Sequence, residues 1–174
     1  IQADLKTMTM LGCFGMSAIT ALTAQNTTGV REICPVPAAF LEQQIAAVCE
    51  DIPPLAVKIG MVYDIPQIHA IAAAVRKYRL PHVVVDPVMV ATSGDALLRS
   101  QAQTALTQEL FPLAEVITPN LPEARQLTGM EITSPAEMEQ AAGTLAERYR
   151  TAVLLKGGRE ALRTNELLTS MILR

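Results

Sequence analysis

Short apolar runs alternate with longer amphipathic segments along most of this 174-residue chain. The apolar runs lie at residues 17–24, 55–59, 82–85, 115–117 and 152–155. Within the third run, Val83–Val85 is β-branched throughout, as expected of a strand that is covered on both faces. Alternation of this kind predicts an α/β fold, a three-layer αβα sandwich around a mostly parallel sheet.

The segments between these runs predict helices. Residues 38–49 carry apolar side chains at helical spacing, and residues 68–79 do the same. Ser134, followed by Pro135 and Glu137, predicts a capping box that opens a helix ending near Tyr149.

Length and composition favour a single domain over residues 1–174. The length falls within the usual range of about 100–200 residues per domain, and 50% of the residues are hydrophobic. No repeat or linker divides the chain. Residues 159–174 show no clean periodicity, so they remain unassigned within the domain.

Composition also excludes several classes of function. A net charge of −3 and an aromatic content of 3% argue against nucleic acid as a partner. No run approaches the roughly 18–20 apolar residues of a membrane span. Three cysteines without metal-ligand spacing indicate reduced thiols in a cytoplasmic protein. With only two histidines, a zinc site or a Ser-His-Asp triad has little material.

Polar residues follow the apolar runs, where ligands of an open α/β sheet bind. In chain order, the residues at these ends are Gln25, Gly60 with Met61, Asp86, Asn120 with Glu123, and Lys156. We expect the ends of these five runs to meet at one edge of the sheet.

Two interpretations of these residues remain open. Asn120 and Glu123 could be a helix cap and its partner, as Asp64 and Gln67 are expected to be, and Asp86 before Pro87 could form a turn. Alternatively, two carboxylates at neighbouring strand ends suit Mg²⁺. A lysine followed by two glycines suits a phosphate. Together, metal and cation at one edge favour phosphoryl transfer.

Several motifs of the chain resemble a known family. In order, they are IQADLKT, ITALTAQNT, KIGM, VVVDPVM with the following TSGD, ITPNLPEA and LLKGG. This series is similar to that of the hydroxymethylpyrimidine and phosphomethylpyrimidine kinases, which belong to the ribokinase-like superfamily and act in thiamine biosynthesis. The resemblance spans residues 1 to about 158.

The resemblance implies an enzyme with ATP as co-substrate and Mg²⁺ as cofactor. It implies phosphorylation of 4-amino-5-hydroxymethyl-2-methylpyrimidine, of its monophosphate, or of both. The implied substrate-binding residues are Asp4, Gln25, Met61 and Val88. The implied nucleotide-binding residues are Asn120, Glu123, Lys156 and Gly158, and the implied metal ligands are Asp86 and Glu123.

The sequence also departs from the family pattern. The family has a glycine-rich strand-turn before the first helix and a GTGC-type loop near its end, which holds the catalytic aspartate. Neither motif is present here, and no aspartate follows Asp95. We therefore expect a ribokinase-like fold that is incomplete at both ends. We also expect no general base among these residues, and no turnover by this polypeptide alone.

Other readings stay open. A pyridoxal kinase shares the superfamily fold and metal site, and a non-catalytic pyrimidine-binding module would keep the pocket without the reaction. A dinucleotide-binding dehydrogenase is disfavoured because no GxGxxG follows a strand. Family members are often homodimers. The apolar face of residues 38–49 could serve such a contact, or it could be core.

Overall fold

The computed structural model describes residues 1–89, 101–157 and 170–173. The helices are α1 (Gln2–Met10), α2 (Ala38–Asp51), α3 (Ile65–Tyr78), α4 (Ala102–Ala105), α5 (Leu121–Thr128) and α6 (Pro135–Tyr149). The strands are β1 (Ala21–Asn26), β2 (Gly29–Pro35), β3 (Val57–Ile59), β4 (Val83–Val85), β5 (Val116–Ile117), β6 (Ala152–Lys156) and β7 (Ser170–Leu173). A π-helical turn, Leu106–Leu110, and a 3₁₀ turn, Phe111–Leu113, extend α4.

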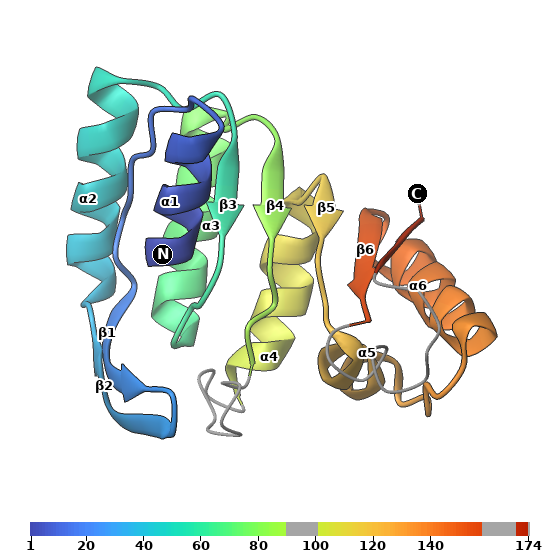
Figure 1. Cartoon of the computed structure of the whole chain (residues 1–174). Coiled ribbons are helices and arrows are strands. Elements are labelled where there is room, and N and C mark those ends of the chain that lie inside the picture. The colour runs from blue at the N-terminus through green and yellow to red at the C-terminus, as the bar shows by residue number, and fades with distance from the viewer. Residues whose placement is uncertain (90–100, 158–169, 174) are drawn as a thin grey trace.

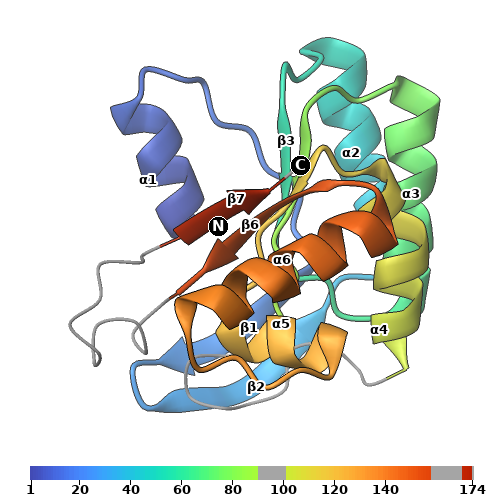
Figure 2. The same cartoon turned by 90° about the vertical axis from the view of Figure 1, so that its right-hand side faces the viewer.

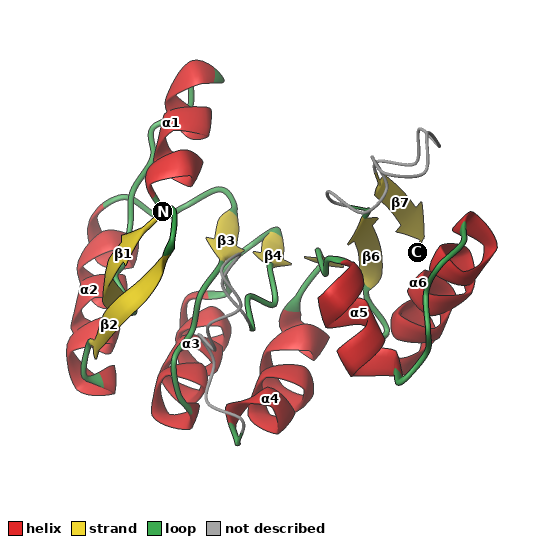
Figure 3. Ribbon diagram, turned by 60° about the horizontal axis from the view of Figure 1, so that its bottom comes forward, coloured by secondary structure: helices red, strands yellow, loops and turns green. Residues whose placement is uncertain are grey.

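The main sheet has the order β3-β4-β5-β6-β7, in which β3 to β6 are parallel and β7 is antiparallel to β6. Helices α2, α3, α4 and α6 lie on one face of this sheet and α1 lies on the other (Figures 2 and 3). This arrangement confirms the predicted α/β class with three layers. It also shows that β7 occupies part of the segment left unassigned, residues 159–174.

The prediction that residues 17–24 form a strand of the parallel sheet was wrong. Strand β1 instead pairs with β2 in a separate antiparallel hairpin. The Asn26 side chain accepts hydrogen bonds from the backbone N–H groups of Thr28 (2.9 Å) and Gly29 (3.2 Å). This turn reverses the chain at once, which leaves no room for the crossover that a parallel strand needs. Figure 1 shows the hairpin on the side where the parallel strands end.

Helix starts follow the predicted capping residues. Ser134 and Glu137 form a capping box at α6, because each side chain accepts a hydrogen bond from the backbone of the other. Hydrogen bonds from the backbone and side chain of Thr133, together with those from Ser134, lower the pKa of Glu137 to about 2. At α3, the Asp64 side chain accepts from the Gln67 backbone, so the expected cap is confirmed there as well.

Gln67 has a second role that its sequence position did not reveal. Its side chain is 1% exposed, and its Nε2 donates to the carbonyl oxygens of Thr20 (2.8 Å) and Val36 (2.7 Å). Its Oε1 accepts from the Tyr63 backbone N–H at 3.1 Å. One buried amide therefore fastens both ends of the β1–β2 hairpin to α3.

We predict that Gln67→Leu lowers the free energy of unfolding by about 3 kcal/mol, because it removes three hydrogen bonds to part-buried backbone groups, those of Thr20, Val36 and Tyr63. Chemical denaturation measures this loss, and amide hydrogen exchange in β1 and β2 should accelerate with it. Gln140→Leu, at an exposed position of α6, is the matched control. Equal stability of the two variants would contradict the role given to Gln67.

The core lies between the sheet and the helices of one face. It includes Ile59, Val85, Ile117 and Val153 from four strands, each at most 7% exposed. On α2, Leu41 and Cys49 are buried, whereas Phe40 is 56% exposed. Within the described ranges, no helix has the length and apolar character needed to cross a membrane.

Candidate active site

Backbone hydrogen bonds continue past the ends of the parallel strands and fix the residues that follow them. The Asp86 N–H donates to the Ile59 carbonyl at 2.8 Å, which ties the residue after β4 to the end of β3. The Lys156 N–H donates to the Pro119 carbonyl at 2.9 Å, next to a parallel bridge between Asn120 and Lys156. The sheet therefore holds these side chains at one edge.

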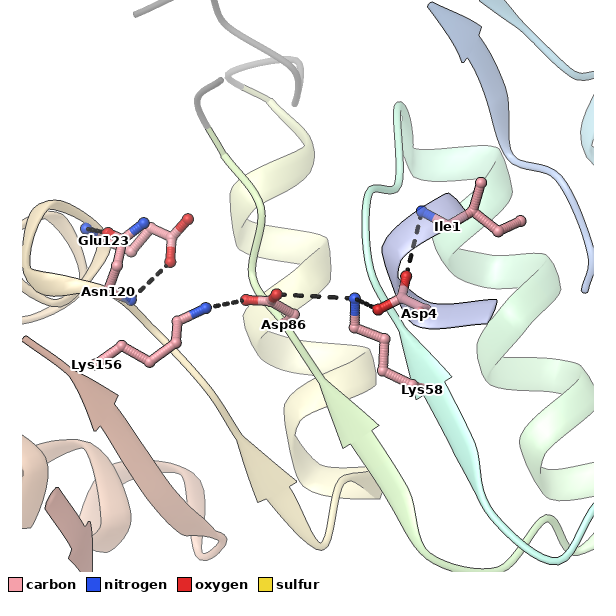
Figure 4. Close-up of polar contacts among 7 residues, drawn as sticks. All are labelled: Ile1, Asp4, Lys58, Asp86, Asn120, Glu123 and Lys156. Carbon is pink, nitrogen blue, oxygen red and sulfur yellow. Dashed lines mark hydrogen bonds and ion pairs between the residues drawn. The ribbon is translucent and has the colours of Figure 1, made fainter. Parts of the chain in front are cut away.

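At this edge, a chain of alternating charges crosses the sheet (Figure 4). The Lys156 ammonium donates to Asp86 Oδ1 at 2.8 Å. The Lys58 ammonium lies 3.8 Å from Asp86 Oδ2 and donates to Asp4 Oδ1 at 3.1 Å. The two lysines approach Asp86 from opposite sides. Since the four residues come from α1, β3, the end of β4 and β6, folding has brought distant segments into one polar network.

Lys58 is the functional candidate that sequence reasoning missed. It lies inside β3 and not after it, so a search of the residues that follow each strand passes over it. The signal in the sequence was the glycine two residues later. A side chain at position 60 would place its Cβ 3.2 Å from the Lys58 Nζ, so Gly60 leaves the space in which the ammonium lies.

Asn120 and Glu123 form a complete capping box at α5, which confirms the structural interpretation of this pair. The Asn120 side chain accepts from the Glu123 N–H at 2.9 Å, and Glu123 Oε2 accepts from the Asn120 N–H at 2.8 Å. The two residues therefore hold the first turn of α5 at the carboxyl edge of the sheet, where Lys156 lies.

Glu123 is also placed to do more than cap a helix. It is 5% exposed, and burial raises its pKa above the ordinary value. Backbone hydrogen bonds from Asn120 and Met89 and the charge of Lys156 oppose this rise, whereas the charge of Asp86 adds to it. Glu123 and Asp86 therefore lie close enough for their charges to interact, and a cation between them would relieve their repulsion.

Asp4 is held in its charged form. Partial burial raises its pKa, but the hydrogen bond and positive charge of Lys58 and the amino group of Ile1 outweigh burial and lower it overall. The Asp4 carboxylate lies 3.1 Å from Lys58 and is about one-third exposed. Asp4 is thus joined through Lys58 to Asp86.

The remaining predicted site residues fall into three groups. Met61 and Val88 are partly buried, and they follow the ends of β3 and β4. The Met61 carbonyl accepts from Thr20 Oγ1 at 2.7 Å, so it contacts the base of the hairpin. Gln25 is exposed within β1, and no hydrogen bond among the described residues joins it to the charged network. Gly158 lies outside the described residues.

The carboxylates supply only part of a metal site. Among the described residues, no group of three or more His, Cys, Asp and Glu side chains could hold a metal ion. Mg²⁺ takes oxygen ligands and is commonly bound by one or two carboxylates together with substrate phosphates and water. Asp86 and Glu123, whose charges repel each other, fit such an incomplete site.

The chemistry of this edge is that of charge neutralisation and positioning. Two lysines provide point charges that suit phosphate oxygens, and neither side chain is fully buried, at 31% and 36% exposure. Asp86 lies between the two ammonium groups. Phosphoryl transfer depends on such fixed charges because the protein takes little part in bond making.

Comparisons with known proteins show the family of the chain. The family model described as phosphomethylpyrimidine kinase matches residues 1–172. A hydroxymethylpyrimidine/phosphomethylpyrimidine kinase of Rhizobium meliloti is 52% identical over 159 residues, which are 91% of this chain and 59% of that protein. The chain thus spans about three-fifths of that relative's length.

Solved structures give the same result. The crystal structure of phosphomethylpyrimidine kinase from Clostridium difficile matches with a TM-score of 0.85 and 41% identity, over 99% of this chain and 73% of that chain. Pyridoxal kinase from Staphylococcus aureus in complex with pyridoxal matches with a TM-score of 0.80 and 33% identity, over 91% of this chain and 57% of that one. The family model covers nearly the whole chain, and the chain therefore belongs to the phosphomethylpyrimidine kinase family.

Proposed function

We propose that the protein containing this chain transfers the terminal phosphoryl group of ATP to 4-amino-5-hydroxymethyl-2-methylpyrimidine, to its monophosphate, or to both, in thiamine diphosphate biosynthesis. The observation that supports this proposal best is the Lys58–Asp86–Lys156 arrangement at the strand ends, beside the buried Glu123. In the reaction, an acceptor oxygen bonds to the terminal phosphorus as the bond to the leaving ADP oxygen breaks, and an alcohol acceptor loses its proton to solvent.

The nucleotide belongs on the Lys156 side of the edge. Lys156 is positioned to donate to phosphate oxygens, since its ammonium already lies 2.8 Å from an anionic oxygen of Asp86. Asn120 and Glu123 hold the first turn of α5 beside it. Gly158 is proposed to contribute backbone to the same subsite.

Asp86 and Glu123 would hold Mg²⁺ together with the phosphates. The bound ion would neutralise negative charge on the transferred group. These two residues suit Mg²⁺ because both are carboxylates, and their charges repel one another in a partly buried site. Asp86 also forms ion pairs with Lys156 and Lys58.

The acceptor belongs on the other side of Asp86. Asp4 and Lys58 lie there, and Met61 and Val88 provide apolar wall beside them. We keep Gln25 as a proposed contact of the aminopyrimidine. Because Gln25 stands on the exposed hairpin, this contact depends on the position of the hairpin relative to the sheet.

A pyridoxal kinase is the second candidate, since such an enzyme matches this chain with 33% identity. The 52% identity to a pyrimidine kinase favours the pyrimidine as substrate.

Free thiols at Cys13, Cys34 and Cys49 fit the proposed cytoplasmic location. The exposed Phe40 on α2 would suit the proposed homodimer. A non-catalytic pyrimidine-binding module would keep the pocket without the reaction.

The test is ADP release by the protein containing this chain, measured with ATP and Mg²⁺ and each acceptor in turn. We expect turnover with the hydroxymethylpyrimidine to exceed turnover with pyridoxal. Faster turnover with pyridoxal would replace the first assignment by the second. Pyrimidine binding without ADP release would support the non-catalytic module instead.

A further inference from the structure

Lys58 has a place in this site that the transfer of phosphate from ATP does not by itself explain. Its ammonium makes a hydrogen bond of 3.1 Å to Asp4 and lies 3.8 Å from Asp86, beyond hydrogen-bond distance. An ammonium group has three donors. The side chain is 31% exposed, so a ligand at this edge can reach the donors that face outward.

The two lysines are not equivalent. Figure 4 shows Lys156 and Lys58 on opposite sides of Asp86, with Asn120 and Glu123 near the first and Asp4 near the second. Lys156 therefore faces the proposed nucleotide side and Lys58 the proposed acceptor side. A cation on the acceptor side interacts only weakly with a neutral alcohol. It forms a strong, charge-assisted hydrogen bond with an acceptor that is itself an anion.

The local backbone favours this position of the lysine. Gly60 leaves space for the end of the Lys58 side chain, because a Cβ at position 60 would lie 3.2 Å from Nζ and 3.9 Å from Cε. Asp4 holds the ammonium from the far side. Lys58 is thus prepositioned above the end of β3, although it is long and flexible.

We propose that Lys58 binds the phosphate of a phosphorylated acceptor and so distinguishes an aminopyrimidine monophosphate from the corresponding alcohol. This inference rests on the proposed function and adds a specificity-determining residue to it. When the phosphomonoester binds, the ammonium donates to its oxygens, while Asp4 keeps hold of the same group. Lys58 thereby favours the second phosphorylation over the first.

The test compares the binding of two ligands by calorimetry, without ATP and with a chelator in place of Mg²⁺. The ligands are 4-amino-5-hydroxymethyl-2-methylpyrimidine and its monophosphate. We expect Lys58→Met to weaken binding of the monophosphate about 10- to 100-fold more than binding of the alcohol. Lys58→Arg should recover part of this difference, since it restores the charge.

Two further variants make the experiment specific. Lys77→Met removes a lysine that is 67% exposed on α3, and it should change neither affinity. Gly60→Ala keeps Lys58 but crowds its ammonium, so it should lower the preference for the monophosphate in the same direction as Lys58→Met.

The outcomes separate the two proposals. Equal loss of affinity for both ligands in Lys58→Met, or no loss, would overturn the assignment of Lys58 while leaving the proposed function intact. A wild-type protein that binds neither pyrimidine would overturn the proposed function and the inference with it. In steady-state kinetics with Mg²⁺ and ATP, we expect Lys58→Met to raise the KM for the monophosphate more than the KM for the alcohol.

Discussion

Replacement of Asp86 with asparagine is expected to lower kcat/KM for ADP formation by about 100- to 1,000-fold, the usual effect of losing a fixed charge at a reacting centre. The carboxylate is the common partner of Lys58 and Lys156, at 3.8 and 2.8 Å, and one of the two proposed ligands of Mg²⁺. Asparagine has nearly the same shape, so it keeps the packing while it removes the charge. Steady-state assays of the protein containing this chain, with ATP and the hydroxymethylpyrimidine, measure the change.

Asp51→Asn is the matched control for this variant. Asp51 is the exposed last residue of α2, and it should keep the activity of the wild type. Thermal unfolding of Asp86→Asn should remain cooperative, because Asp86 and its lysine partners are partly exposed and such ion pairs contribute little to stability. Wild-type kcat/KM in Asp86→Asn would contradict the placement of the phosphoryl transfer at this edge.

The second large effect is expected for Glu123→Gln. This substitution separates the two roles of Glu123, which caps α5 and carries a charge beside Asp86. Glutamine can still accept from the Asn120 N–H, so the capping box persists. The charge beside Asp86 is lost, and we expect kcat to fall about 100-fold. Glu123→Ala removes the cap as well, and it should destabilise the protein by about 1 kcal/mol more than Glu123→Gln.

The pH dependence of stability provides an independent check on Glu123. Its pKa is raised in the folded protein, chiefly by burial, so the folded state binds its proton more tightly than the unfolded state does. Wild-type stability therefore falls as the pH rises from the ordinary glutamate pKa through the raised one. Without divalent cations, we expect Glu123→Gln to be more stable than the wild type at neutral pH. This difference in the free energy of unfolding should shrink in acid. A gain that grew in acid would contradict the burial argument.

The sequence predicted most of the fold because its signals there are local. The β-branched run Val83–Val85, the capping box at Ser134 and the cap at Asp64 act within a few residues, and each is present in the structure. The hairpin was missed because its apolar run resembles a buried strand. The Asn26 turn decides the pairing there, through hydrogen bonds that its side chain accepts from the backbone of Thr28 and Gly29.

The candidate site was predicted less completely, for a physical reason. Residues at or directly after the end of a strand can be located from the apolar runs, and Asp86 and Lys156 do make contact. Lys58 belongs to a strand, and its role emerges only when α1 brings Asp4 beside β3. Gln67 likewise contacts two carbonyls more than 30 positions away, at Thr20 and Val36, which no local pattern encodes.

The most direct test of the account is a crystal structure of the protein with a non-hydrolysable ATP analogue and the hydroxymethylpyrimidine. We expect nucleotide phosphates within hydrogen-bond distance of Lys156 and next to Asp86, with the pyrimidine on the side of Asp4 and Met61. Phosphates bound away from the carboxyl ends of β3, β4, β5 and β6 would contradict it.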